Sequence, residues 1–184
     1  MKDIIEVNSE SISDINQINT GDTLLVSSHS WLAKKIQNFE KCNWNHAGLF
    51  FWVYGKLFVA EMVACGLVLT DFEEYIKGKS HLLICIPRFK IDGVEYGKYI
   101  IPKLGKTRYG FFNLLIAQPI KFITGKRIWL GNNNENPKRL ICGEFVEMVY
   151  NHFHPEYFTT WKEDAPSDIY NSILFNKYEF KRIK

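Results

Sequence analysis

The sequence predicts a single globular domain that combines α-helices with β-strands, and three observations support this prediction. The chain has 184 residues, of which 46% are hydrophobic and 15% aromatic, enough to bury one substantial core. Two segments rich in strand-forming residues flank a short turn near Gly55, as in a β-hairpin. Between Phe145 and Phe153, apolar residues recur at the spacing of a helix. We therefore treat residues 1–184 as one domain.

The first part of the chain predicts a polar lead-in, a strand-sized run and a short helix. Residues 1–20 are polar and rich in Ser and Asn, so we expect the domain proper to begin at the turn Gly21-Asp22. The apolar run Thr23–Val26 follows. Ser30 could then cap an amphipathic helix whose period is set by Trp31, Leu32, Lys35, Ile36 and Phe39.

Five segments between residues 45 and 103 have recognisable patterns: two strands of a hairpin, a helix, a buried strand and a second helix. In chain order, they are Asn45–Val53, Leu57–Val63, Asp71–Lys77, Leu82–Pro87 and Tyr96–Lys103. Aromatic and β-branched residues favour the strands. The first helix starts in a capping box, Thr70 to Glu73. Pro102 should end or bend the second helix.

The last third of the chain holds an unusual stretch, a loop and the helix of the apolar stripe. Tyr109–Leu130 mixes aromatic, aliphatic and basic residues, and Pro119 breaks its period. This stretch fits a core helix with a connection, or a surface that contacts lipid or an acyl chain. Gly131–Pro137 predicts a polar loop. After the helix, Asp168–Ile183 either returns along the surface or adds a final strand.

Composition argues against several classes of protein. With 23 Lys+Arg and 20 Asp+Glu, the net charge of +3 is too small to suggest a nucleic-acid partner. No apolar run approaches the roughly 18 residues of a membrane-spanning helix, and the amino terminus lacks the pattern of a secretory signal, so we expect a cytoplasmic protein. The cysteines form no Cys-x-x-Cys pair, and Cys42-x-x-x-His46 has no second half, so we expect neither disulfides nor a metal site.

Cys142 stands at the start of the predicted helix, which is a suitable position for a nucleophile. A thiol there meets unpaired backbone N–H groups and the positive end of the helix dipole, and both favour the thiolate. The backbone N–H of Cys142 could also face the oxygen of a tetrahedral intermediate. Taken alone, a single Cys before an apolar helix is usually a small core residue, so a structural role stays open.

His46 is the best placed of the five histidines to serve as the base for such a thiol. It begins a predicted strand, and it shares one strand face with Gly48, Phe50 and Trp52. The other histidines lie beside caps or at the ends of elements, where structural roles account for them; they are His29, His81, His152 and His154. A hydrogen-bonded structural imidazole is the alternative for His46.

Glu61 is suited to hold the imidazole of His46 in the required tautomer. It lies within the second hairpin strand, on an apolar face where an unpaired carboxylate would be unfavourable. A two-residue loop at Tyr54-Gly55 places Glu61 opposite Gly48 and diagonal to His46, about 7–8 Å away between backbones. A three-residue loop would put the pair on opposite faces. A solvated Glu61 or a salt bridge with a lysine is the alternative.

Six short motifs follow one another along the chain from Gly21 to Asp168. They are Gly21-Asp22, Asn45-His46-Ala47-Gly48, Val59-Ala60-Glu61, Gly105-Lys106-Thr107-Arg108-Tyr109, Ile141-Cys142-Gly143-Glu144-Phe145-Val146 and Ala165-Pro166-Ser167-Asp168. In this order, they resemble the permuted papain-like cysteine hydrolases of the YiiX/YebB type, in the NlpC-type peptidase superfamily. In papain-like enzymes Cys precedes His, whereas here His46 precedes Cys142, as in the permuted branch. Lecithin retinol acyltransferase-like proteins share this order.

The resemblance implies an α+β fold in which a small antiparallel sheet or open barrel packs on the helix that bears the nucleophile. It also implies three catalytic roles, with Cys142 as nucleophile, His46 as general base and Glu61 as orienting acid. Tyr109 and Gly143 would lie at the substrate. Gly143 stands where the family often has Ser, and Gly110 stands where an acid is frequent.

The sequence therefore favours a cysteine hydrolase that requires no cofactor. Cys142 would attack the carbonyl of a peptide or amino-acid amide, such as a cell-wall peptide fragment, and water would release the thioester. The same thiol could act on a lipid ester, N-acyl amine or thioester, as hydrolase or acyltransferase, with residues 109–130 in peripheral contact with lipid. A catalytically silent domain that binds peptide or lipid is a third hypothesis. The oligomeric state is not determined by the sequence.

Overall fold

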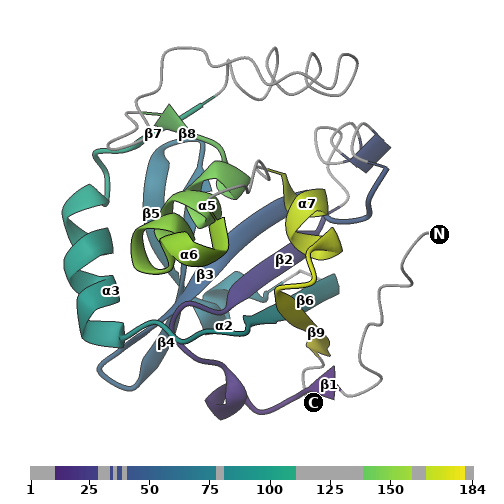
Figure 1. Cartoon of the computed structure of the whole chain (residues 1–184), viewed down its shortest axis with the longest axis horizontal. Coiled ribbons are helices and arrows are strands. Elements are labelled where there is room, and N and C mark those ends of the chain that lie inside the picture. The colour runs from purple at the N-terminus through teal and green to yellow at the C-terminus, as the bar shows by residue number, and fades with distance from the viewer. Residues whose placement is uncertain are drawn as a thin grey trace.

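The structure, a computed structural model, describes residues 11–28, 34, 37–38, 41–77, 81–110, 139–158 and 165–180. These residues build an α+β fold around a seven-stranded sheet with the strand order β1-β9-β6-β2-β3-β4-β5. Neighbouring strands run antiparallel from β9 to β5, whereas β1 is parallel to β9. The described sheet is open, and helices lie against it (Figure 1).

The strands of the large sheet are β1 Ser11–Ile12, β2 Thr23–Ser27, β3 His46–Val53, β4 Lys56–Val63, β5 Gly66–Asp71, β6 His81–Pro87 and β9 Phe175–Phe180. A separate parallel pair joins β7 Arg108–Tyr109 to β8 Arg139–Leu140. The helices are η1 Ile15–Gln17, α2 Phe72–Tyr75, α3 Gly93–Ile100, η2 Ile101–Lys103, α5 Cys142–Phe153, α6 Pro155–Phe158 and α7 Pro166–Asn171.

Apolar side chains cover both faces of the large sheet, because successive residues of a strand point to opposite sides. Leu49 belongs to the cluster that packs against α5 and α3, while its neighbour Phe50 belongs to the cluster that packs against α2. In the same way, Leu25 belongs to the first of these clusters and Leu24 to the second. The sheet is therefore the middle layer, and α5 crosses its front in Figure 1.

The hairpin of β3 and β4 forms with the predicted register. Val53 pairs with Lys56, and Gly48 pairs with Glu61. The turn Tyr54-Gly55 has φ angles of 48° and 75° at its two residues. Two central residues with positive φ are typical of the type I′ turn, whose twist matches that of the flanking strands. This turn sets which side chains of β3 and β4 lie next to each other.

The predicted helix with the apolar stripe is α5, and Cys142 is its first residue. Its inner face is fully buried at Phe145, Val146, Val149 and Tyr150. The Tyr150 hydroxyl donates to the carbonyl oxygen of Gly21 at 2.6 Å and lies 2.6 Å from the hydroxyl of Thr23. These bonds attach the middle of α5 to the start of β2, so the helix is held at one position on the sheet.

Two helices begin at residues other than the predicted ones. Asp71, and not Thr70, caps α2 by accepting from the backbone N–H of Glu73 at 2.9 Å. The helix α3 begins at Gly93 because the carboxylate of Asp92 caps it. The helix α2 is shorter than predicted, whereas α3 is shifted toward the N-terminus and ends before Pro102, which lies in η2.

Both ends of the described chain take part in the sheet. Residues 11–20 do not form a separate lead-in, because they include β1 and η1, and Ile18 is buried. The C-terminal segment predicted over Asp168–Ile183 includes part of α7 and then β9, which lies between β1 and β6. The short strand β5 was not predicted. Three predicted segments lie outside the described residues: most of the helix expected after Ser30, residues 111–130, and the loop 131–137.

Candidate active site

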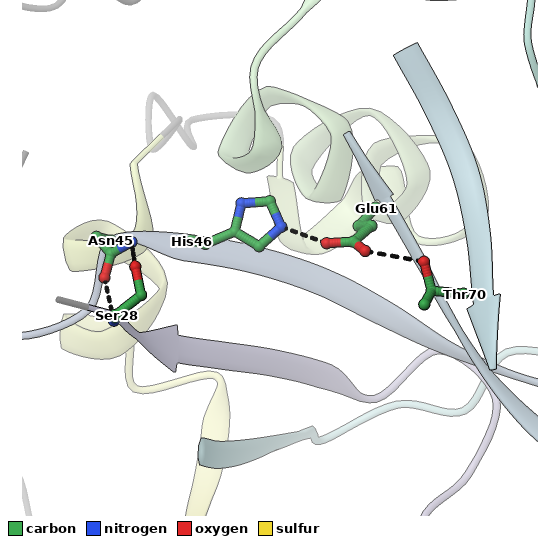
Figure 2. A network of polar contacts seen from close by, with 5 residues as sticks. All are labelled: Ser28, Asn45, His46, Glu61 and Thr70. Atoms are coloured by element: carbon green, nitrogen blue, oxygen red, sulfur yellow. Dashed lines mark hydrogen bonds and ion pairs between the residues drawn. The ribbon is translucent and has the colours of Figure 1, made fainter. Parts of the chain in front are cut away.

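His46 and Glu61 lie side by side at one end of the β-hairpin (Figure 2). The Nε2 atom of His46 is 2.7 Å from Oε2 of Glu61. Gly48 lies opposite Glu61 and has no side chain to block the contact between Glu61 and His46. A larger residue does not fit at this position, because a Cβ atom at Gly48 would stand only 2.7 Å from Cγ1 of Val59. The diagonal relationship predicted from the two-residue turn is therefore present as a direct side-chain contact.

Cys142 reaches the same imidazole from the first turn of α5. Its side chain lies close enough to His46 to raise the pKa of the imidazole, and the residue is 6% exposed. The Nε2 atom of His46 is occupied by Glu61, so Nδ1 is the ring nitrogen without a partner among the described contacts of this ring, and we assign it to the sulfur. Thiol, imidazole and carboxylate thus follow one another, with the ring in the middle. The structure brings together the three residues that the sequence predicted for catalysis.

The surroundings of His46 favour its charged form. Burial alone would lower the pKa of the imidazole, but the hydrogen bonds with Cys142 and Glu61, together with the charges of both groups, raise the pKa of His46 to about 10. The His46 side chain is 22% exposed and that of Glu61 only 8%. The ring therefore keeps its proton through neutral pH, and Glu61 is the carboxylate that balances this charge.

Glu144 organises the backbone at the start of α5. Its carboxylate Oε2 accepts from the backbone N–H of Ile141 at 2.9 Å, as the third helical residue of a capping box does. Glu144 is buried, and this bond spans the position of Cys142. The bond shows that the side chain of Glu144 caps this helix start.

Glu61 has two further neighbours that the sequence did not predict. The Thr70 hydroxyl donates to Oε1 of Glu61 at 3.0 Å (Figure 2). Tyr75, buried on α2, lies near this carboxylate; burial first, and then the charge of Glu61, raise the pKa of Tyr75 well above its usual range. The apolar environment of Glu61 was the available signal that its carboxylate requires donors.

Tyr109 and Gly143 both lie beside the thiol. Tyr109 pairs with Leu140 in the β7–β8 ribbon, two residues before Cys142. Burial, followed by the charges of Cys142 and Glu144, raises the pKa of Tyr109 above its usual range. Gly143 is buried in the first turn of α5. Their predicted contact with substrate stays a prediction.

Asn45 fixes the chain immediately before His46. Its side-chain oxygen accepts from the backbone N–H of Ser28 at 2.7 Å, and its amide nitrogen donates to the Ser28 hydroxyl at 3.0 Å (Figure 2). Its own backbone N–H donates to Val26 at 3.0 Å. Since Asn45 is buried, these bonds hold the entrance to β3 and hence the position of the imidazole.

Comparison with known proteins identifies the fold. No family model matches the chain, and no curated protein matches it significantly. Its structure is similar to that of the metalloprotein YiiX from Escherichia coli O157:H7, with a TM-score of 0.64. The two chains are 15% identical over 91% of this chain and 99% of YiiX. This protein therefore has a YiiX-like α+β fold.

The description of YiiX as a metalloprotein raises the question of a metal here. Over the described ranges, no group of three or more His, Cys, Asp and Glu side chains is arranged to hold a metal ion. The donor set of these residues does not fit a metal centre, and we derive no step through one. Among the described helices, none is long and apolar enough to cross a membrane.

Proposed function

We propose that the protein is a cysteine hydrolase of the permuted papain-like type, with Cys142, His46 and Glu61 as its catalytic triad. One observation supports this most directly: the imidazole of His46 contacts the Glu61 carboxylate at 2.7 Å and is close enough to Cys142 for that residue to raise its pKa. Nucleophile, base and orienting acid in this order are the arrangement recognised by geometry across unrelated triads. The order of the three residues along the chain agrees with the permuted branch.

The reaction begins with the proton of Cys142 on the His46 ring. The thiolate sulfur attacks the carbonyl carbon and forms a tetrahedral intermediate, whose oxygen faces backbone N–H groups at the start of α5. His46 then donates its proton to the leaving amine as the C–N bond breaks, and an acyl thioester remains on Cys142. Water attacks the thioester and gives up a proton to the ring, which releases the carboxylic acid and restores the thiolate. These steps use no cofactor.

The electrostatics of His46 favour an amide over an ester as substrate. An amine leaves only when it is protonated, so amide cleavage needs a general acid at the scissile bond. A ring whose pKa is raised to about 10 carries the required proton across the physiological range. We therefore propose a peptide or amino-acid amide substrate in the cytoplasm. Ester hydrolysis or acyl transfer with the same triad is the competing chemistry, and a silent binding domain is the non-enzymatic one.

Alkylation of the thiols tests the enzymatic proposal directly. Iodoacetamide near neutral pH should label Cys142 faster than Cys42, Cys65 and Cys85, as measured by mass spectrometry of peptides. The His46→Ala variant should lose this selectivity. Cys142→Ala should abolish turnover of amides and change the melting temperature by only a few degrees, because a small side chain is lost. Equal and slow labelling of all four thiols would support the silent domain instead.

A substrate panel separates the two chemistries. Aminoacyl and γ-glutamyl amides are incubated beside short-chain esters, and free amine and free acid are measured. We expect hydrolysis of amides that depends on Cys142. Activity confined to esters would contradict the amide proposal while leaving the triad in place.

A further inference from the structure

Each oxygen of the Glu61 carboxylate faces a different neighbour. Oε2 faces Nε2 of His46 at 2.7 Å, and Oε1 accepts from the Thr70 hydroxyl at 3.0 Å. The Tyr75 hydroxyl is buried near the same carboxylate: burial first, and then the charge of Glu61, raise the pKa of Tyr75. These contacts come from three elements, β3, β5 and α2, which meet at Glu61 on β4. The carboxylate therefore contacts the His46 ring with one oxygen and accepts the Thr70 hydroxyl with the other, and the Tyr75 hydroxyl is buried nearby.

The register of the sheet explains why Thr70 and His46 lie on either side of Glu61. On β3, Gly48 is opposite Glu61, and His46 is two residues before Gly48. On β5, Val68 is opposite Glu61, and Thr70 is two residues after Val68. Both are diagonal neighbours that share the face of Glu61, which is the arrangement in which side chains of adjacent strands meet. Tyr75 closes the site from α2, where it is 3% exposed.

We infer that Thr70 and Tyr75 are positioning residues of the active site, which keep Glu61 ionised and turned so that Oε2 faces His46. This inference rests on the proposed function, since it assigns the two hydroxyls a part in the same triad. Neither hydroxyl touches the reacting atoms. They act through Glu61, whose orientation determines which tautomer and which charge His46 holds.

The physical reason is the preference of a buried carboxylate for hydrogen-bond donors. A hydroxyl that donates to a carboxylate stabilises its charged form. When that donor is removed, the carboxylate takes up a proton more readily, and His46 then loses the anion that holds its own proton. The other groups around the site do not replace Glu61: Tyr75 and Tyr109 stay neutral because burial raises their pKa values, and Glu144 is bonded to Ile141.

Four variants test the inference. Thr70→Val and Tyr75→Phe each remove one hydroxyl and keep most of the side-chain volume. Thr70→Ser keeps the hydroxyl. Thr20→Val is the matched control, because the Thr20 hydroxyl accepts from the backbone N–H of Trp52 at 3.1 Å, far along β3 from His46. Each variant is first checked for folding by its melting temperature.

The main readout is the titration of the His46 ring, followed by NMR of its Cε1–H group in the full chain. In the native protein, we expect the midpoint well above the ordinary 6.5. In Thr70→Val and in Tyr75→Phe, the midpoint should fall by about one pKa unit or more. It should stay at the native value in Thr70→Ser and Thr20→Val. A purely structural role of the hydroxyls would change the melting temperature without moving this midpoint.

An unchanged midpoint in folded Thr70→Val and Tyr75→Phe overturns the inference. If Thr70→Val does not fold, the result for Tyr75→Phe decides. The rate of iodoacetamide labelling at Cys142 is measured in parallel. Like the midpoint, this rate should change in Thr70→Val and Tyr75→Phe and stay at the native value in Thr70→Ser and Thr20→Val. Absence of selective labelling or turnover in the native protein contradicts the proposed function, whereas the titration of His46 tests the inference separately.

Discussion

The Glu61 carboxylate lies 2.7 Å from the His46 imidazole because a two-residue turn at the opposite end of the hairpin sets the register between their strands. The turn determines that Glu61 faces Gly48 and not the residue before or after it. A shift of one residue would send one of the two side chains to the other face of the sheet. The candidate active site therefore depends on a turn that lies outside it.

Replacing Gly48 tests how closely the two strands must approach. A Cβ atom at Gly48 would stand 2.7 Å from Cγ1 of Val59 and 3.1 Å from the carbonyl oxygen of Ala60. We expect Gly48→Ala to destabilise the fold by about 1–3 kcal/mol and to displace Glu61 from His46. The measurement is urea unfolding together with the titration of His46.

Gly93→Ala provides the control for this substitution, because the nearest atom to a Cβ there is Thr20 Oγ1 at an ordinary 3.6 Å. Gly93 lies at the start of α3, and alanine should leave the stability unchanged or slightly increased. Equal stability of both variants and the native protein would contradict the close contact at Gly48.

Neutralising Glu61 should weaken catalysis more than folding. In Glu61→Gln, an amide replaces the charge that helps to hold the proton on His46, so the pKa of His46 should fall from about 10 toward its ordinary value. We expect kcat to drop by about 10²–10⁴, as when the orienting acid of a triad is replaced by an amide. The pH profile of turnover and the ring titration measure the two effects. Native kcat in this variant would show that Glu61 does not orient the base.

The charge of His46 predicts how stability depends on pH. Its pKa is about 10 in the folded protein and 6.5 as a free group, so the folded state retains the proton more strongly. The resulting stabilisation is fully present below pH 6.5 and is lost as the pH rises through 10. Urea unfolding at several pH values should show a steeper loss of stability above pH 7 in the native protein than in His46→Gln. Parallel curves for both proteins would contradict the raised pKa.

Asp22 predicts a second pH effect, outside the active site. Its carboxylate is buried and accepts from the backbone N–H of Asn19 at 2.8 Å, and burial raises the pKa of Asp22 to about 7. Because the folded state binds this proton more tightly than the unfolded state, the contribution of Asp22 to stability decreases as the pH rises from 3.8 through 7.

The substitution Asp22→Asn keeps an acceptor for Asn19 and removes the charge. At pH 8 the variant should therefore be more stable than the native protein by about 1 kcal/mol or more, with a smaller difference at pH 5. Chemical denaturation at the two pH values measures this difference. A variant that is less stable at pH 8 would show that the charged carboxylate is satisfied in the fold.

The hairpin and the nucleophile helix could be predicted because their signals are local. Alternation along β3 and β4 identifies the faces, and the two positions Tyr54-Gly55 determine the pairing. The helical stripe from Phe145 onward places Cys142 at a helix start. Local patterns therefore determined which strand bears His46, which strand bears Glu61, and how these two strands are paired.

The donors to Glu61 could not be found in the same way. Thr70 lies in a sequence with the form of a capping box, but its hydroxyl bonds with Glu61, and Asp71 caps α2 instead. Tyr75 reaches the carboxylate only because α2 packs on that face of the sheet. Alternation shows which face a residue occupies, but it does not show which strand or helix lies beside that face.

By itself, the sequence determined the two hairpin strands with their pairing, and the helix that begins at Cys142 with its apolar face. Only the tertiary structure decided that β9 pairs with β6, that the start of α5 meets His46, and that Thr70 and Tyr75 lie beside Glu61. The reason is that turns and hydrophobic periods act over a few neighbouring residues. Contacts between distant segments depend instead on how all apolar faces are buried together, which no single segment specifies.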